Sequence, residues 1–228
     1  MIKKVFNQGK ALKALRENPC KGIEKLSEKE HERNRFILPH ELNTLVAASR
    51  QTKAKYYMPA LIYLAAEHGA SKQEALSLLW SDITFDYHGK GLIRFFRTKN
   101  DRERTEYLMP RTKQALLEWQ EHQKWMRAKK KIDTNGSMLV FSHLDGSPLK
   151  NFNRAWWSSC EIAGIENFRF HDLRHTFCSN LILSGSGLKE VKEMIGHRDI
   201  STTDRYAHLI FDHKSLKQQQ LAEYYEKA

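Results

Sequence analysis

Residues 171–177 read "HDLRHTF", with two histidines four positions apart and an arginine directly before the second. On a helix that advances about 100° per residue, the apolar residues of this stretch fall on one side, and His171, Arg174 and His175 share a neighbouring arc. A polar arc beside a buried face is where a site can be held rigidly. The stretch is compatible with a metal site, an anion site, or a helix with polar residues at its surface.

The metal interpretation rests on the spacing of His171 and His175, which is that of two metal-ligating histidines on one helix face. Asp172 stands where the zinc hydrolase motif has Glu, Arg174 would lie close to the cation, and no third ligand follows at a familiar spacing. An anion site fits better, because arginine offers a planar, permanently charged fork to two phosphate oxygens. A zinc hydrolase is therefore a distant alternative.

The charge of the chain points to a polyanionic partner. Its 228 residues include 38 Lys and Arg against 27 Asp and Glu, for a formal net charge of +11. The positive charge is spread along the chain, so we expect a folded surface rather than a basic tail to present it. Nucleic acid is the first candidate partner, with a merely solvated basic surface as the alternative.

The composition favours a compact intracellular protein. Forty per cent apolar residues suffice for a packed core, no apolar run approaches the ~18 residues of a membrane span, and the first residues lack the apolar core of a secretion signal. Cys20, Cys160 and Cys178 are odd in number and far apart, which fits a reducing compartment. We expect a cytoplasmic protein that does not cross a membrane.

The hydrophobic pattern predicts a mainly α-helical domain with a small three-stranded antiparallel sheet (α+β), beginning near Phe36. Residues 6–17 predict a short helix, and the polar residues 20–35 a linker. The segments "DITFDY", "GLIRFFRT" and "RTEYLMP" have the period of strands. A long helix is expected from Pro110 to about Lys130, and further helices at roughly 151–163, 171–184, 187–195, 201–207 and 213–227.

Further polar residues follow "HDLRHTF" at defined distances. Gly196 suits a helix stop, and His197, directly after it, follows Arg174 by 23 residues. Ser201–Asp204 is a capping-box pattern that predicts a new helix, with Tyr206 in its second turn. Each feature is common by itself, but the combined spacing is specific.

With this spacing the chain resembles the tyrosine recombinase (phage integrase) family over about residues 36–212. The pattern consists of His171-x-x-Arg174, then His197 after a glycine, then Tyr206. The resemblance implies the catalytic-domain fold of that family.

Two further segments support the resemblance. "GASKQEALSLLWSDI" (69–83) is similar to the family's first box, and "RTKNDRERTEYLMP" (97–110) to its hairpin, with Lys99 at the position of the catalytic lysine. The resemblance also implies that residues 1–35 are a remnant of an upstream DNA-clasping domain plus a linker. Residues 36–228 would be the catalytic domain with its C-terminal helix.

The family breaks and rejoins DNA through a covalent 3′-phosphotyrosine, and it uses neither metal nor any other cofactor. The resemblance makes Tyr206 the nucleophile, Arg174 the clamp on the scissile phosphate and His171 a proton-handling residue. It makes His197 a donor to a phosphoryl oxygen and Lys99 the general acid. A phenol has an ordinary pKa of about 10, so cationic neighbours are needed to favour the phenolate and stabilise phosphoryl charge.

The resemblance also implies partners and a location. Double-stranded DNA is the expected substrate, and a homo-tetramer is expected only on DNA. The protein would be encoded by a bacterium or a phage and associated with the nucleoid in the cytoplasm. We expect His175, unlike its neighbours, to be structural.

The first box departs from the family pattern G-x-R-x-x-E at its arginine. Gly69, Glu74 and Trp80 fix the register, so Ser71 occupies the first-arginine position, which Glu74 would support from behind. Lys72 is one residue along and would point about 100° away. Loss of a cationic clamp lowers rates by on the order of 10²–10⁵. We therefore expect a weakened recombinase, with a catalytically inactive DNA-binding integrase remnant as the alternative.

Overall fold

The computed structural model describes residues 2–23, 35–97, 102–132, 138–196, 201–204 and 206–226. They belong to two compact units, residues 1–33 and 34–228. Two of the expected site residues, Lys99 and His197, lie outside the described residues.

The first unit contains helix α1, Ile2–Ala11. The helix predicted at residues 6–17 therefore begins and ends earlier. Lys13 adopts a left-handed conformation with φ of 55°, which stops the helix. The Asn18 side chain then donates a hydrogen bond back to Oδ1 of Asn7 at 2.6 Å, which holds the following turn.

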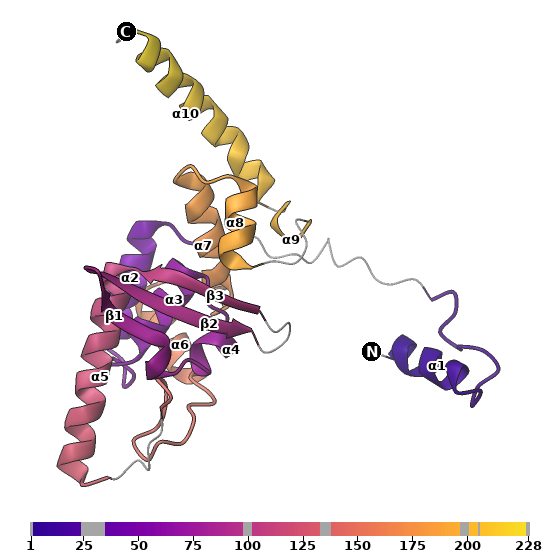
Figure 1. The fold of residues 1–228 in the computed structure, drawn as a ribbon, viewed down its shortest axis with the longest axis horizontal. Coiled ribbons are helices and arrows are strands. Elements are labelled where there is room, and N and C mark those ends of the chain that lie inside the picture. The colour runs from indigo at the N-terminus through magenta and orange to yellow at the C-terminus, as the bar shows by residue number, and fades with distance from the viewer. Residues whose placement is uncertain are drawn as a thin grey trace. The chain divides into compact units, whose positions relative to one another are not determined.

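The second unit is mainly helical, with one three-stranded antiparallel sheet among its described residues, as predicted (Figure 1). Its first helices are α2 (Pro39–Ser49), α3 (Met58–His68), α4 (Lys72–Leu76) and the 3-10 turn η2 (Trp80–Asp82). The strands are β1 (Ile83–Tyr87), β2 (Lys90–Arg97) and β3 (Arg102–Leu108). The later helices are α5 (Pro110–Lys130), α6 (Asn153–Ile162), α7 (Asp172–Leu183), α8 (Leu188–Ile195), α9 (Ser201–Asp204) and α10 (Ala207–Glu226).

The strands are paired in the order β1-β2-β3. In the β2–β3 pair, Phe95 lies opposite Arg104. Alternation along β3 turns Arg104, Glu106 and Leu108 toward the domain and leaves the residues between them exposed. Two of these three inward-facing side chains, those of Arg104 and Glu106, are charged, and buried charges need polar partners. They find these partners in the candidate functional site.

The main core surrounds α3, whose sequence is apolar on nearly every side. It also includes inward residues of α2, α5, α6 and the sheet, together with the segment after α5. In that segment Val140 and Phe141 are fully buried, and Trp119 of α5 donates its indole N–H to the Val140 carbonyl at 2.7 Å.

A smaller second core joins α7, α8 and the start of α10. It contains Phe177, Cys178, Ile182, Val191, Ile195, Tyr206 and Leu209. Its importance is positional, because it fixes Tyr206 against the helix that carries Arg174.

The chain around Tyr206 differs from the predicted helix 201–207. Helix α9 ends at Asp204, and α10 begins at Ala207 rather than at residue 213. Between them the Tyr206 N–H donates to the Thr203 carbonyl at 3.0 Å, a tight turn of the i→i−3 kind. The turn brings the Tyr206 ring into the second core, where it is 4% exposed.

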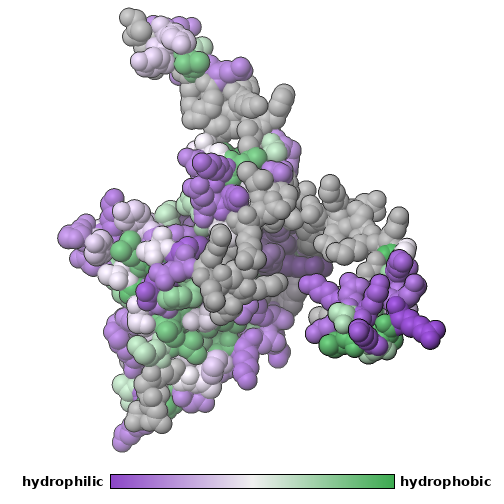
Figure 2. Space-filling model, turned by 45° about the vertical axis from the view of Figure 1, so that its right-hand side comes forward, coloured by the Kyte–Doolittle hydropathy of each residue, from purple (hydrophilic) through white to green (hydrophobic). Residues whose placement is uncertain are grey.

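Hydrophilic side chains cover most of the described surface on the face shown in Figure 2. No helix within the described ranges is long and apolar enough to cross a membrane.

Candidate functional site

Arg174 is the centre of the candidate site. Its guanidinium is buried in α7 and donates from Nη1 to the Gly69 carbonyl at 2.5 Å and to Glu74 Oε2 at 3.4 Å. Its Nη2 donates to the Ile195 carbonyl at 2.9 Å. One side chain therefore connects the ends of α3 and α8 with α4. A buried cation is stable only with such partners.

Gly69 is required by two features of this arrangement. It ends α3 in the left-handed conformation, with φ of 59°, which L side chains rarely adopt. A Cβ atom at this position would lie 2.7 Å from the Phe177 ring. Only glycine allows α7 to approach closely enough for Arg174 to reach the Gly69 carbonyl.

The rotation of α7 is fixed at its first turns. The Asp172 carboxylate accepts the Arg169 N–H at 2.8 Å, which holds the turn that leads into the helix. Thr176 Oγ1 donates to the Asp172 carbonyl at 2.9 Å and accepts the Ile37 N–H at 3.2 Å. These bonds tie α7 to the segment before α2. The polar arc predicted from the sequence is thereby held in one orientation.

Tyr206 meets this arc at His175. The Tyr206 hydroxyl lies 2.5 Å from His175 Nδ1, with the imidazole half-buried. The exposed ring of His171 stands perpendicular to that of His175, with 5.4 Å between their centroids. The histidine in contact with the tyrosine is therefore His175, which the sequence marks only by its place on the same arc as His171 and Arg174.

Ser71 begins α4 as its N-cap. Its Oγ accepts the Glu74 N–H at 3.2 Å, and its own N–H donates to Glu74 Oε2 at 2.8 Å, which is a capping box. Lys72 lies elsewhere, with Nζ 3.3 Å from Asn153 Oδ1 and 4.7 Å from the Phe152 ring centroid. Helix α4 thus directs the Glu74 carboxylate toward Arg174, while its lysine, Lys72, contacts Asn153 and Phe152 instead.

A second arginine reaches Glu74 from the sheet. Arg104 Nε lies 3.7 Å from Glu74 Oε1, and its guanidinium stacks 4.3 Å above the Phe95 ring. Arg104 Nη1 also pairs with the Glu106 carboxylate and donates to the Met194 carbonyl at 3.3 Å. We did not predict this residue from the sequence, although the alternation of β3 places Arg104 and Leu108 on the same inward face.

Two ionisable side chains near the arginines, those of Glu74 and His68, have shifted pKa values. Burial raises the pKa of Glu74, but Arg104, the Ser71 N–H and Arg174 together outweigh burial and hold that pKa below its ordinary value. Burial lowers the pKa of His68 to about 4, so its imidazole is neutral near pH 7.

Neutral His68 supports the sheet side of the site. Its Nδ1 donates to Glu106 Oε2 at 3.0 Å, while its Nε2 accepts the Met109 N–H at 3.4 Å. The Glu106 carboxylate that holds Arg104 is thus anchored in its turn by the last residue of α3. These side chains form a continuous series of contacts, which runs from His68 through Glu106, Arg104 and Glu74 to Arg174.

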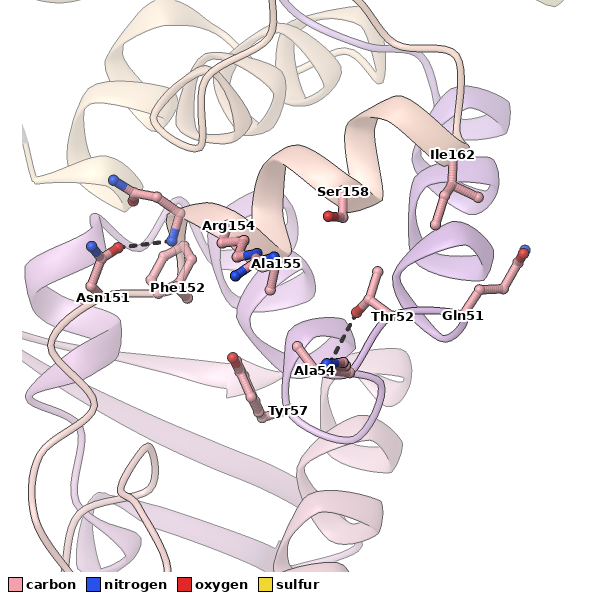
Figure 3. A pocket seen from close by; sticks show the side chains of 12 residues that line it. Gln51, Thr52, Ala54, Tyr57, Asn151, Phe152, Arg154, Ala155, Ser158 and Ile162 are labelled. Atoms are coloured by element: carbon pink, nitrogen blue, oxygen red, sulfur yellow. Dashed lines mark hydrogen bonds between the residues drawn. The ribbon is translucent and has the colours of Figure 1, made fainter.

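A cavity with a volume of about 640 Å³ lies apart from this cluster (Figure 3). It lies between the turn after α2 and helix α6, and Figure 3 shows Tyr57, Arg154 and Ser158 on its walls. None of the described site residues lines it. The candidate site is therefore the cluster of arginines and tyrosine, and not this cavity.

The sequence profile of the phage integrase family matches residues 35–213, which include every residue singled out above. The chain belongs to the phage integrase family. The match spans most of the second unit.

Similar proteins include other members of the phage integrase family. The integrase of Salmonella phage P22 is 28% identical over 193 residues, which are 84% of this chain and 48% of that protein. The tyrosine recombinase XerC of Thermodesulfovibrio yellowstonii is 28% identical over 172 residues, 74% of this chain and 53% of the relative. The chain therefore spans about half the length of these relatives.

The fold is shared with solved recombinase structures. The XerH site-specific recombinase, bound to its palindromic difH substrate in a post-cleavage complex, superposes with a TM-score of 0.65 at 21% identity. The superposition covers 83% of this chain and 53% of XerH. At this identity the likeness establishes the fold of the phage integrase family for this chain.

Proposed function

We propose that this chain is the catalytic part of a site-specific recombinase, which cuts and rejoins double-stranded DNA through a covalent 3′-phosphotyrosine at Tyr206. One observation carries the proposal: the Tyr206 hydroxyl is in contact with His175, and the residue directly before His175 in α7 is the buried Arg174. Helix α7 thus holds the proposed phosphate-binding cation next to the residue that contacts the proposed nucleophile.

In this reaction the Tyr206 oxygen attacks the scissile phosphorus, and the bond from phosphorus to the 5′ oxygen breaks. The products are a 3′-phosphotyrosine and a free 5′ hydroxyl, so the energy of the broken ester bond is kept in the new one. Arg174 stabilises the charge that develops on the non-bridging oxygens. No cofactor is needed, because a second DNA strand reverses the same step.

Two proton transfers complete the cleavage. The phenol must lose its proton, and His171 and His175 are the imidazoles on the helix arc that faces Tyr206. The 5′ oxygen must gain a proton, a role we assign to Lys99. We assign His197, the second residue after Ile195 in the chain, to a phosphoryl oxygen.

The relatives support the wider setting of the proposal. XerH is described as a site-specific recombinase bound to its difH substrate, and we extend duplex DNA as substrate to this chain. We also propose that the chain forms a tetramer only on DNA, and that it acts on nucleoid DNA in the cytoplasm of a bacterium. Residues 1–35 would be the end of an upstream DNA-clasping domain plus its linker.

A second candidate function is a DNA-binding remnant without chemistry. Ser71 favours it, because the position that should supply an arginine supplies a helix cap instead. The two candidates share the surface charge and the fold. They differ in whether a covalent bond to DNA forms.

The test is a nicked duplex from which the short product strand diffuses away, so that religation cannot reverse cleavage. A band that migrates as protein plus DNA on a denaturing gel is expected with the parent chain and lost in Tyr206→Phe. Tyr224→Phe is the matched control, because Tyr224 is exposed on α10. The proposal fails if the parent gives no such band, on duplexes it binds and with an upstream clasping domain supplied. The binding remnant then stands.

A further inference from the structure

Glu74 connects two arginines rather than one. Its Oε2 lies 3.4 Å from Arg174 Nη1, and its Oε1 lies 3.7 Å from Arg104 Nε. All three side chains are nearly buried, at 5% exposure for Glu74, 9% for Arg174 and 11% for Arg104. The carboxylate that should support an arginine from position 71 supports one from β3 instead.

The two guanidiniums also share the end of α8. Arg104 Nη1 donates to the Met194 carbonyl at 3.3 Å, and Arg174 Nη2 donates to the Ile195 carbonyl at 2.9 Å. Consecutive carbonyls and one carboxylate therefore place the two arginines side by side. A phosphate oxygen is a charged acceptor, and it makes stronger hydrogen bonds to guanidinium than a neutral carbonyl does. Bound DNA can thus replace the α8 carbonyls as the acceptor.

Arg104 is held in a single position before any DNA arrives. Its guanidinium is stacked on Phe95, the residue opposite it in the sheet, and is paired with Glu106. Glu106 is in turn bonded to His68 at the end of α3. Preorganised donors of this kind lose little free energy to reorganisation when charge develops on a substrate.

We infer that Arg104 is the second phosphate-binding arginine of the site, supplied from β3 in place of the arginine that Ser71 does not provide. The inference rests on the proposed function, since the ligand it names is the scissile phosphodiester. Lys72 is turned toward Asn153 and Phe152. The site then has two arginines that can stabilise charge on the phosphoryl oxygens, and Ser71 need not abolish activity.

The test compares Arg104→Gln with Arg94→Gln in the full chain. Arg94 is the matched control, because it is also a sheet arginine, but it is 44% exposed and paired with Asp82. On the nicked duplex, Arg104→Gln should lower the rate of adduct formation by about 10²–10³-fold. Arg94→Gln should stay within about threefold of the parent. Arg104→Lys keeps the positive charge but loses the planar fork of the guanidinium, so its rate of adduct formation should lie between those of Arg104→Gln and Arg94→Gln.

A substrate with a neutral phosphorus centre separates contact with the phosphate from support of the fold. Replacing one non-bridging oxygen of the scissile phosphate by a methyl group removes the charge that Arg104 would stabilise. The deficit of Arg104→Gln relative to the parent should then shrink by at least about tenfold. A variant that is merely misfolded keeps the same deficit on both substrates.

A second change tests the replacement directly. Adding Ser71→Arg to Arg104→Gln should recover part of the lost rate, because a guanidinium from position 71 can again lie beside Glu74. The inference is overturned if Arg104→Gln and Arg104→Lys cleave like the parent, or if their deficit is equal on the charged and neutral substrates. If the parent itself forms no adduct on either substrate, the proposed function has failed rather than the assignment of Arg104 within it.

Discussion

The Tyr206 hydroxyl lies 2.5 Å from Nδ1 of His175, across the contact between α7 and the turn that precedes α10. The ring of Tyr206 is buried in the second core, so the position of its oxygen depends on that packing. Because Arg174 precedes His175 in the same helix, this hydrogen bond holds the proposed nucleophile near the proposed phosphate clamp.

Removal of the imidazole should slow cleavage without weakening DNA binding. His175→Phe should lower the rate of adduct formation by about 10²-fold, in line with loss of a general base or of nucleophile positioning. His171→Phe should lower it too, as expected for a proton-handling residue that is not in contact with Tyr206. Single-turnover rates at saturating protein measure both. Unchanged rates in His175→Phe would return that residue to a structural role.

Gly69→Ala should destabilise the fold more than an ordinary left-handed glycine does. Gly69 has φ of 59° and Phe177 2.7 Å from the added Cβ, whereas Gly164 has φ of 65° and nothing within 4 Å. Gly164→Ala should therefore lose about 1 kcal/mol from backbone strain alone. Gly69→Ala should lose on the order of 3 kcal/mol, since overpacking adds about 1–3 kcal/mol. Urea unfolding measures the difference, and equal losses would show that Phe177 yields freely.

His68 should make stability depend on pH. Burial lowers its pKa from 6.5 to about 4 in the folded state, so between these values the unfolded chain binds more protons. Stability should therefore fall as pH decreases from about 6.5 to about 4, by on the order of 3 kcal/mol from this residue.

The measurement is the free energy of unfolding in urea at several pH values across that window. His68→Gln should flatten the dependence, and His40→Gln, an exposed change in α2, should not. A slope that is the same in His68→Gln and the parent would mean that His68 is already charged in the folded state.

Duplex DNA should bind with strong salt dependence. A net charge of +11 spread over the chain implies several phosphate contacts, and each one formed releases a counterion. The logarithm of the affinity should fall linearly with the logarithm of salt concentration, with slope about −0.9 per phosphate contacted. Fluorescence anisotropy between 50 and 300 mM salt (roughly a sixfold range) gives this slope. Affinity that barely changes over this range would argue against a phosphate-binding surface.

The sequence predicted the parts of the site that depend on spacing along the chain. "HDLRHTF" placed Arg174 on a buried edge of a helix, and the period-two segments predicted the sheet. Gly69 stops α3 in the conformation that glycine favours. These features follow from local chemistry, so a single sequence contains enough information to predict them.

The remaining features depend on contacts between distant segments. The register of β2 against β3 decides that Arg104 stacks on Phe95 and reaches Glu74, 30 residues away in the sequence. The turn that buries Tyr206 makes α9 shorter than the predicted helix, and it places the Tyr206 hydroxyl in contact with His175. Lys99 and His197 remain predictions from their spacing, because both lie outside the described residues.

The most direct measurement is to identify the amino acid and the DNA end that are joined in the covalent adduct. Adduct from the nicked duplex would be digested with protease and sequenced by mass spectrometry. We predict a single modified peptide, linked through the Tyr206 oxygen to a 3′ phosphate, with a free 5′ hydroxyl on the other strand end. Attachment at another residue or to a 5′ phosphate, or no adduct at all on bound DNA, would contradict the assignment of Tyr206 as nucleophile.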